Sequence, residues 1–324
     1  MRTFRFSRWI KVAAAALFAV VTAAACGSSA SGTSASGPVN KVHAGWPTTI
    51  VLGEVGQENA TALTQSLAPM QKLLQAKMGV KLTVVTGTSY ASMIEAQQAG
   101  KAQLIEYGPF SYVIALNKGL KIENVGIPID APNTDGGYFS QAVVNPKLTP
   151  QITTLKDFAG KKTCFSDPAS TSGYLYPSYG LLSVGISPTT GVTPVFAGSD
   201  STAPLEVAKG SCQVGFTNNL SLPVIFTQNH IPKSDIKIVW TSPEIPGSPL
   251  AASDSLPASF RSALESILLK DANSPYYAAH GYCSSVTACT TLTAQYGFAK
   301  PSVANYSQIT TICKVTKSPS CKIS

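Results

Sequence analysis

A run of hydroxyl-bearing residues, DPASTSGY at 167–174, is the part of the sequence best suited to chemistry. It follows a stretch ending at Phe165 that is typical of a strand, and a helical pattern begins at Ser172. At the start of a helix several backbone N–H groups lack partners and the dipole favours an anion, while Ser and Thr hydroxyls add uncharged donors. The run therefore predicts an oxyanion site. Taken alone, it is also typical of an ordinary Ser/Thr helix cap, which is the commoner structure.

The sequence around this run alternates between strand and helix patterns. Strands are expected at 48–52, 80–85, 103–107, 139–144, 162–165, 192–196, 213–216 and 236–240. Helices are expected at 63–78, 90–98, 111–117, 155–158, from Ser172, and at 257–271, with a further short element at 204–209. The alternation predicts parallel sheets covered by helices on both faces, with ligands at the carboxyl ends of the strands. The Pro-, Asn- and Gly-rich segment 130–138 predicts a crossover into a second unit.

The beginning of the chain has the pattern of a secretory signal. Four cations, at Arg2, Arg5, Arg8 and Lys11, precede an apolar stretch at 12–25 that is short for a membrane span. The residues Ala23-Ala24-Ala25-Cys26-Gly27 resemble the bacterial lipobox, in which the cysteine is diacylated. The alternative is a plain signal-peptidase site after Ala25. The Gly-, Ser- and Ala-rich composition that follows favours an anchored flexible tether, at 26–46.

Composition limits the classes of partner. About 300 residues remain after the signal, enough for two lobes with sizeable cores. Removing the four cations of the signal from the formal charge of +8 leaves +4, spread along the chain without a basic run. This gives little reason to expect nucleic acid and is compatible with an anionic ligand.

Six cysteines remain besides Cys26, and an even number in an exported chain predicts disulfides. They are Cys164, Cys212, Cys283, Cys289, Cys313 and Cys321. Local pairing favours Cys283–Cys289 and Cys313–Cys321, which leaves Cys164–Cys212, although 15 pairings are open. No CxxC pair exists and the histidines, His43, His230 and His280, have no ligand spacing, so neither a metal nor a cofactor is expected.

Five blocks in order resemble a known family. STSGYLYPSY at 170–179 resembles a conserved stretch of the phosphate/phosphite/phosphonate ABC-transporter binding proteins. The other blocks are YASMIEA at 90–96 with Gly100-Lys101, EYGPFSYVIA at 106–115, GFTNN at 215–219 and SPEIPGSP at 242–249. The resemblance extends over about 48–269, and the order of five blocks is more specific than any one of them.

The resemblance implies an α/β fold of the type II periplasmic-binding-protein class, with two lobes, each a mostly parallel sheet flanked by helices, and a ligand cleft between them. Lobe 1 would combine 47–135 with 242–324, and lobe 2 would hold 136–241.

The resemblance also implies ligand contacts. Ser170, Thr171 and Ser172 would hold the oxyanion, with Tyr90 and Tyr107 contributing from the opposite lobe. A phenol can donate one hydrogen bond while its ring excludes water. Without the resemblance, Tyr90 would be an aromatic at a helix start and Tyr107 a core residue. Asn218 and its neighbour Asn219 could supply amide donors or simply form a turn.

One position departs from the family pattern. Many members carry Gly-Ser-His, whereas this chain has Gly198-Ser199-Asp200. A carboxylate repels a dianion, so Asp200 either points away as a solvated loop residue or accepts a proton from an oxyanion that still carries one. The solvated loop is the favoured interpretation.

Together these features predict an exported, lipid-anchored solute-binding protein, monomeric, that delivers phosphate, phosphite or a small alkylphosphonate to the membrane permease of an ABC importer. No acidic residue aligns with the amine-binding position of aminoalkylphosphonate binders. The alternatives are binding of another small anion, a sulfonate or carboxylate, or a secreted hydrolase. The last is disfavoured because the chain has no Gly-x-Ser-x-Gly elbow. The tail beyond Tyr277 lies outside the resemblance.

Overall fold

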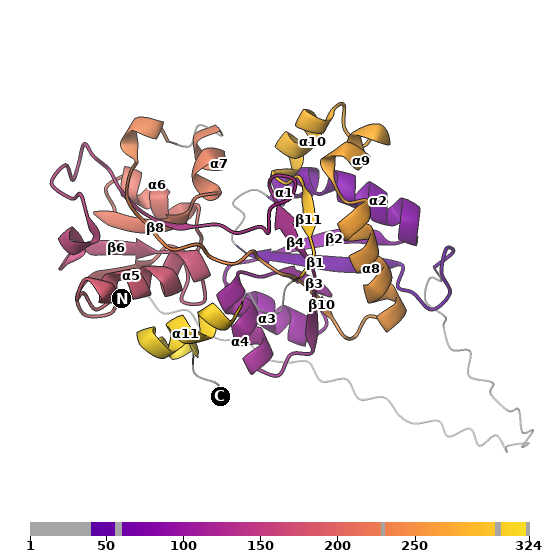
Figure 1. Cartoon of the computed structure of the whole chain (residues 1–324), viewed down its shortest axis with the longest axis horizontal. Coiled ribbons are helices and arrows are strands. Elements are labelled where there is room, and N and C mark those ends of the chain that lie inside the picture. The colour runs from indigo at the N-terminus through magenta and orange to yellow at the C-terminus, as the bar shows by residue number, and fades with distance from the viewer. Residues whose placement is uncertain (1–39, 56–59, 228–230, 302–305, 322–324) are drawn as a thin grey trace, which may run out of the picture. The chain divides into compact units, whose positions relative to one another are not determined.

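The structure is a computed structural model that describes residues 40–55, 60–227, 231–301 and 306–321 (Figure 1). The predicted signal, Cys26 and most of the predicted tether lie outside these residues, as does His230. Two sheets organise the described chain, one of six strands and one of five.

The six-stranded sheet has the order β11-β4-β10-β3-β1-β2. Strand β1 pairs in parallel with β2 and β3, whereas β10 runs antiparallel between β3 and β4, and β11 lies antiparallel beside β4. The strands are β1 (Thr49–Val55), β2 (Lys81–Gly87), β3 (Leu104–Glu106), β4 (Ile122–Ile129), β10 (Leu250–Ser253) and β11 (Gly297–Ala299). The first sheet is therefore built from two parts of the chain, and the part between them forms the second sheet.

Helices cover both faces of this sheet. Leu73 and Leu74 of α2 and Phe260 of α8 belong to one buried cluster, and Ile94 of α3 and Phe110 of α4 belong to another. The helices are α1 (Ala60–Ser66), α2 (Ala68–Met78), α3 (Tyr90–Gln98), α4 (Pro109–Asn117) and α8 (Ala258–Lys270). Helix α3 begins with a capping box in which Ser89 and Ser92 exchange hydrogen bonds.

The five-stranded sheet has the order β7-β6-β8-β5-β9, with β5 antiparallel to both of its neighbours. Its strands are β5 (Ser140–Val144), β6 (Lys162–Phe165), β7 (Thr193–Phe196), β8 (Val214–Asn218) and β9 (Lys237–Thr241). The helical segments of this part of the chain are η1 (Leu155–Phe158), η2 (Thr171–Leu175), α5 (Tyr176–Ser183), α6 (Thr202–Ala208), α7 (Ser221–Thr227) and η3 (Lys233–Asp235). The stacked rings of Phe165 and Phe216, 5.4 Å between centroids, lie in its core.

The C-terminal part adds α9 (Ser274–Ala279), α10 (Val286–Thr293), α11 (Ser307–Thr316) and η5 (Pro319–Cys321). The described residues form three disulfides, Cys164–Cys212, Cys283–Cys289 and Cys313–Cys321, which confirms the two predicted local pairs and the pair that they leave. Helix α11 packs against both α4 and α5. Its buried Ile309 and Ile312 share a cluster with Phe110 of α4 and with Tyr176 of α5.

The α/β class and the two helix-flanked sheets agree with the predicted fold. In the first sheet β1, β2, β3 and β4 run in one direction, and in the second sheet only β5 is reversed, so both are mostly parallel. The predicted helix 63–78 is divided at Leu67: α1 ends at Ser66 and α2 begins at Ala68, with Pro69 in its first turn. The proline cannot donate to the preceding turn, so a new helix starts there.

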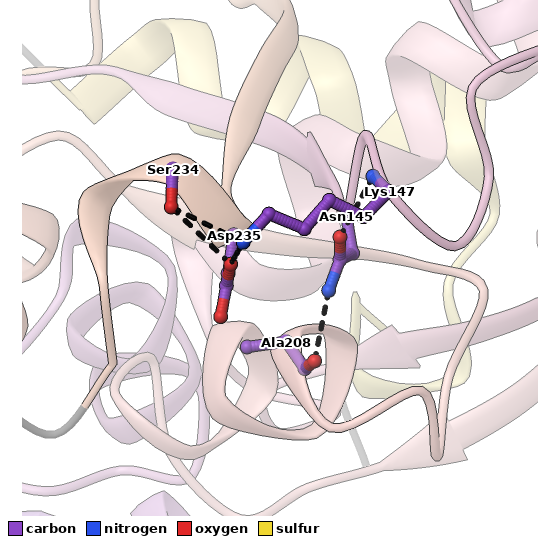
Figure 2. A network of polar contacts seen from close by, with 5 residues as sticks. All are labelled: Asn145, Lys147, Ala208, Ser234 and Asp235. Atoms are coloured by element: carbon purple, nitrogen blue, oxygen red, sulfur yellow. Dashed lines mark hydrogen bonds and ion pairs between the residues drawn. The ribbon is translucent and has the colours of Figure 1, made fainter.

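A polar network braces one end of the second sheet (Figure 2). Asn145, directly after β5, donates to Ala208 O at 2.9 Å and accepts from Lys147 N at 3.0 Å. The Lys147 ammonium contacts Asp235 at 2.5 Å and Ser234 at 3.3 Å. An exposed pair of this kind contributes about 1 kcal/mol or less. Among the described residues, the members of this network form no hydrogen bond or ion pair with the hydroxyl-rich turn, so they offer control positions.

Within the described ranges, no helix is long and apolar enough to cross a membrane. The same residues contain no group of three or more His, Cys, Asp or Glu side chains placed to hold a metal ion.

Candidate ligand-binding site

The hydroxyl-rich turn lies where β6 ends, as the sequence predicts. Ser170 caps the following π-helical turn η2, and its hydroxyl accepts from Gly173 N at 2.9 Å. A Cβ on Gly173 would collide with Ser166 Oγ and lie 2.7 Å from Asp200 Oδ1. Glycine is required here because two polar side chains approach the backbone of the turn so closely.

The three consecutive hydroxyl residues are almost completely buried, none more than 2% exposed. Thr171 Oγ1 accepts from Phe110 N, at the start of α4, at 2.9 Å. The carbonyl of Ser172 accepts from Ser140 Oγ at 2.6 Å. Ser170 and Thr171 are therefore already engaged in polar contacts, one inside the turn and the other with a helix of the first sheet.

The carboxylate of Asp200 lies directly on this turn. Its Oδ1 accepts from Ser166 Oγ at 2.5 Å and from Ser170 Oγ at 3.5 Å, and the Asn218 side chain also hydrogen-bonds to it. Burial raises the pKa of Asp200, and these hydrogen bonds partly offset the shift. The interpretation of Asp200 as a solvated loop residue is therefore wrong, because the turn between β7 and α6 folds the side chain back onto η2.

Two phenols reach the turn. Tyr90, the first residue of α3, lies beside the Ser170 side chain, and Tyr138 lies beside those of Thr171 and Ser248. Burial raises the pKa of both phenols, and the nearby charge of Asp200 adds to the increase. Both remain protonated donors at neutral pH.

The structure brings Tyr90 to the site as the resemblance implies, but it does not bring Tyr107 there. The Tyr107 side chain is completely buried, and its hydroxyl donates to Gln97 Oε1 at 2.9 Å within the first sheet's helical layer. Tyr138, which sequence reasoning missed, contacts the turn instead. Its position at the end of the predicted crossover was the available signal.

Asn218 and Asn219 have different roles. Asn218 Oδ1 accepts from Leu220 N at 3.0 Å and Ser221 N at 2.8 Å, which stabilises the start of α7, while its side chain also contacts Asp200. Asn219 Oδ1 accepts from Phe139 N at 2.7 Å. Asn218 thus reaches the turn through Asp200, whereas Asn219 serves as a brace between β5 and β8.

A second carboxylate of the turn joins it to the other sheet. Asp167 is 7% exposed and accepts from Ala169 N at 2.7 Å, and its carboxylate also lies near Tyr90 N at the start of α3. The hydroxyl-rich turn therefore places a side-chain oxygen at the start of two helices of the first sheet. Asp167 lies at the start of α3, and Thr171 lies at the start of α4.

Glu106, at the end of β3, is a further perturbed carboxyl group. Burial raises the pKa of Glu106 to about 7. The sequence block EYGPFSY contains it, but nothing in the block indicated that the acid is desolvated.

A cavity of about 470 Å³ lies behind the turn, between α3, α4 and the C-terminal η5. The turn residues Asp167, Pro168 and Ala169 line it, together with Ser89 and Ile94 of the first part of the chain. The three hydroxyl residues do not line this cavity, so it is separate from the hydroxyl face of the turn.

The arrangement can bind an anion through uncharged donors. None of the four ion pairs among the residues described involves Asp200 or Asp167, and no cation contributes to the pKa shifts of the turn. Serine hydroxyls here contact carboxylates and backbone rather than an imidazole base, so the geometry provides no activated nucleophile.

Comparison with known proteins identifies a family. The model of the family described as "ABC transporter, phosphonate, periplasmic substrate-binding protein" matches residues 52–283. The phosphate-import protein PhnD of Mycolicibacterium smegmatis is 32% identical over 320 residues, covering 96% of this chain and 98% of that protein. The phosphonates-binding periplasmic protein of Escherichia coli is 29% identical over 205 residues, covering 61% of this chain and 59% of that protein.

Solved structures share the fold. PhnD1 of Prochlorococcus marinus in complex with methylphosphonate has a TM-score of 0.69 at 20% identity, covering 84% of this chain and 99% of that one. A binding protein of a phosphonate ABC transporter from Pseudomonas aeruginosa has a TM-score of 0.71 at 20% identity, covering 84% and 87%. The alkanesulfonate-binding protein SsuA of Xanthomonas axonopodis, bound to MOPS, has a TM-score of 0.57 at 16% identity, covering 86% and 97%.

Proposed function

The chain belongs to the family of periplasmic substrate-binding proteins of phosphonate ABC transporters, and we propose that it captures phosphate, phosphite or a small alkylphosphonate for import. Proteins of this family bind and deliver a solute and do not turn it over. The observation that carries the proposal is the buried turn of three hydroxyl residues, with the phenols of Tyr90 and Tyr138 beside it and no ion pair at its carboxylates among the described residues. Neutral donors at a helix start suit an oxyanion.

The proposed contacts come from Ser170, Thr171 and Ser172, with Tyr90 and Tyr138 opposite them. Asn218 and Asp200 complete the polar surroundings, whereas Tyr107 lies outside them, bonded to Gln97. A relative that covers nearly the whole chain is named as a phosphate-import protein, which favours phosphate within this ligand class. Sulfonate or carboxylate binding is the alternative, because sulfonate-binding proteins share the fold.

Calorimetry of the mature, disulfide-bonded chain tests the ligand class. Phosphate, phosphite, methylphosphonate, aminoethylphosphonate and sulfate are titrated separately. We expect at least one of the first three to bind with micromolar affinity or better, about −8 kcal/mol. Tight binding of a sulfonate or carboxylate, with no heat from any phosphorus oxyanion, would establish the alternative.

The domain division belongs to the same proposal. Lobe 1 would contain 47–135 and 242–324, and lobe 2 would contain 136–241, preceded by a signal at 1–25 and a tether at 26–46. Sheet membership supports the division, because β5 to β9 form one sheet and the remaining strands form the other.

Export and anchoring follow from the N-terminal pattern. We propose that Cys26 carries lipid, such as palmitate, and holds a monomeric protein at the outer face of the membrane beside its permease. Cys26→Ser should release the protein from the membrane fraction, whereas Cys283→Ser, in the C-terminal part, should not. Metabolic labelling with a palmitate analogue gives an independent readout, and equal labelling of wild type and Cys26→Ser would contradict the anchor.

A further inference from the structure

Asp200 is the group in the candidate site with the least obvious reason to be there. A site for anions gains nothing from a carboxylate that repels them, yet Asp200 Oδ1 lies within 3.5 Å of Ser170 Oγ. The absence of a side chain at Gly173 makes room for it. Ser166 and Asn218 also hydrogen-bond to the carboxylate, so several residues fix its position.

The charges around Asp200 do not neutralise it. Asp167, from the turn after β6, adds a second negative charge, and Tyr90 from α3 and Tyr138 before β5 face it as neutral phenols. No ion pair among the described residues involves Asp200. A fully ionised ligand would therefore meet a carboxylate with no cation to offset the repulsion.

An oxyanion that still carries a proton avoids this repulsion. A carboxylate can only accept hydrogen bonds, so a ligand O–H directed at Asp200 turns an unfavourable contact into a charge-assisted hydrogen bond. Hydrogen phosphate keeps such a proton throughout the neutral range. Sulfate has none, and phosphite and alkylphosphonates lose theirs at their last ionisation.

We propose that Asp200 makes the site selective for oxyanions that carry a proton on oxygen. This inference rests on the proposed function and assigns the basis of its selectivity: phosphate is accepted across the neutral range, sulfate is rejected, and alkylphosphonates are accepted only while singly ionised. Ser166 and Asn218 act as positioning residues because they hold the acceptor in place.

Three anions distinguish the possibilities, namely phosphate, methylphosphonate and sulfate, titrated into the mature chain at about pH 6 and about pH 9. We expect wild-type phosphate affinity to change by less than about threefold, and methylphosphonate affinity to fall about tenfold per pH unit above its last ionisation. Sulfate should bind at least about 100-fold more weakly than phosphate. Glu106 also titrates in this range, but its charge affects the binding of phosphate and of methylphosphonate. The ratio of the two affinities therefore reports the loss of the proton on methylphosphonate itself.

Asp200→Asn replaces the acceptor with a group that can also donate. We expect sulfate to bind at least about tenfold more tightly, phosphate about tenfold more weakly, and the pH dependence of the ratio of methylphosphonate to phosphate affinity to disappear. Asp235→Asn is the matched control, since its carboxylate pairs with exposed Lys147 on the same sheet, and it should reproduce wild type.

Each outcome has a defined meaning. An unchanged ratio of sulfate to phosphate affinity in a folded Asp200→Asn variant would overturn the inference. If that variant does not fold, tight sulfate binding by wild type, or a flat methylphosphonate profile, would overturn it equally. Failure of every phosphorus oxyanion to bind wild type would instead reject the proposed function.

Discussion

The hydroxyl groups of the turn are not equivalent at the scale of single residues. Ser170 caps η2, whereas Thr171 contacts Phe110 N and Tyr138 and so links the turn to its surroundings. Removing one hydroxyl leaves the backbone donors in place, so a single substitution should weaken binding without abolishing it.

Thr171→Ala should reduce the affinity for the preferred anion about tenfold, roughly 1 to 2 kcal/mol, because Phe110 N and Tyr138 lose a partner. Thr171→Ser keeps the hydroxyl and should recover most of the loss. Calorimetry measures both. Equal affinity in wild type and Thr171→Ala would mean that the anion binds away from the turn.

Tyr138→Phe and Tyr107→Phe form a matched pair that separates ligand contact from support. The first removes a donor at the turn and should weaken binding about tenfold with little change in stability. The second removes the hydrogen bond to Gln97 and should lower the free energy of unfolding by about 1 kcal/mol with little change in affinity. The opposite pattern, with affinity lost only in Tyr107→Phe, would restore Tyr107 as the ligand contact.

Glu106 should make stability depend on pH. Its folded pKa of about 7 lies above the ordinary value, so the folded protein binds more protons than the unfolded chain between those values. Stability should therefore be greatest below the ordinary pKa and fall by up to roughly 3 kcal/mol as pH rises through 7. Denaturant unfolding at about pH 5 and about pH 8.5 measures this, and Glu106→Gln should remove most of the decline. A parallel decline in Glu106→Gln would assign it to another group.

Sequence reasoning located the turn because hydroxyl residues after an apolar strand have a local signature. It could not place Tyr107 and Tyr138 correctly, because the direction of a phenol depends on what surrounds it. Tyr107 points toward Gln97, and Tyr138 reaches Thr171 after the chain crosses between sheets. The position of the Asp200 side chain also depends on Ser166 and Gly173, which lie well before it in the sequence.

At the scale of elements, local signals worked best where the element is self-contained. The bounds of α3 match the expected range because Ser89 and Ser92 form a capping box at its start. Strands β10 and β11 were not predicted, since each is short and is defined by antiparallel pairing with strands distant in sequence. The tail helices had no family basis, and the family model also ends at residue 283.

Helix α11 lies outside the residues that the family model matches. It packs against α4, from the part of the chain that forms the first sheet, and against α5, from the part that forms the second sheet. Ile309 is completely buried there. Ile309→Ala should lower the free energy of unfolding by about 2 to 4 kcal/mol and also weaken anion binding, because both helices adjoin the site. Val315→Ala, at a half-exposed position of the same helix, should change neither. Chemical unfolding and calorimetry give the two readouts, and lost stability with unchanged affinity would limit α11 to a structural role.

At the scale of the whole molecule, the hydroxyl-rich turn joins the two sheets. Thr171 accepts from Phe110 N, and the Asp167 carboxylate lies near Tyr90 N, so side chains of the second sheet's turn face two helix starts of the first. The segment proposed to bind the anion therefore also helps to hold the sheets together. Affinity should depend on these contacts even where they do not touch the ligand.

Asp167 allows that dependence to be tested, because its carboxylate contacts backbone N–H groups of Ala169 and Tyr90. Asp167→Ala leaves both donors unpaired in the bound arrangement, so affinity should fall about tenfold to 100-fold, mainly through faster dissociation. Asp167→Asn retains an acceptor oxygen and removes a negative charge near the anion, so it should bind at least as tightly as wild type. Stopped-flow dissociation of the bound anion from the three proteins measures the difference. Equal dissociation rates would show that the contact between Asp167 and α3 does not contribute to ligand retention, and slow dissociation from Asp167→Asn alone would assign the effect of Asp167 to its charge.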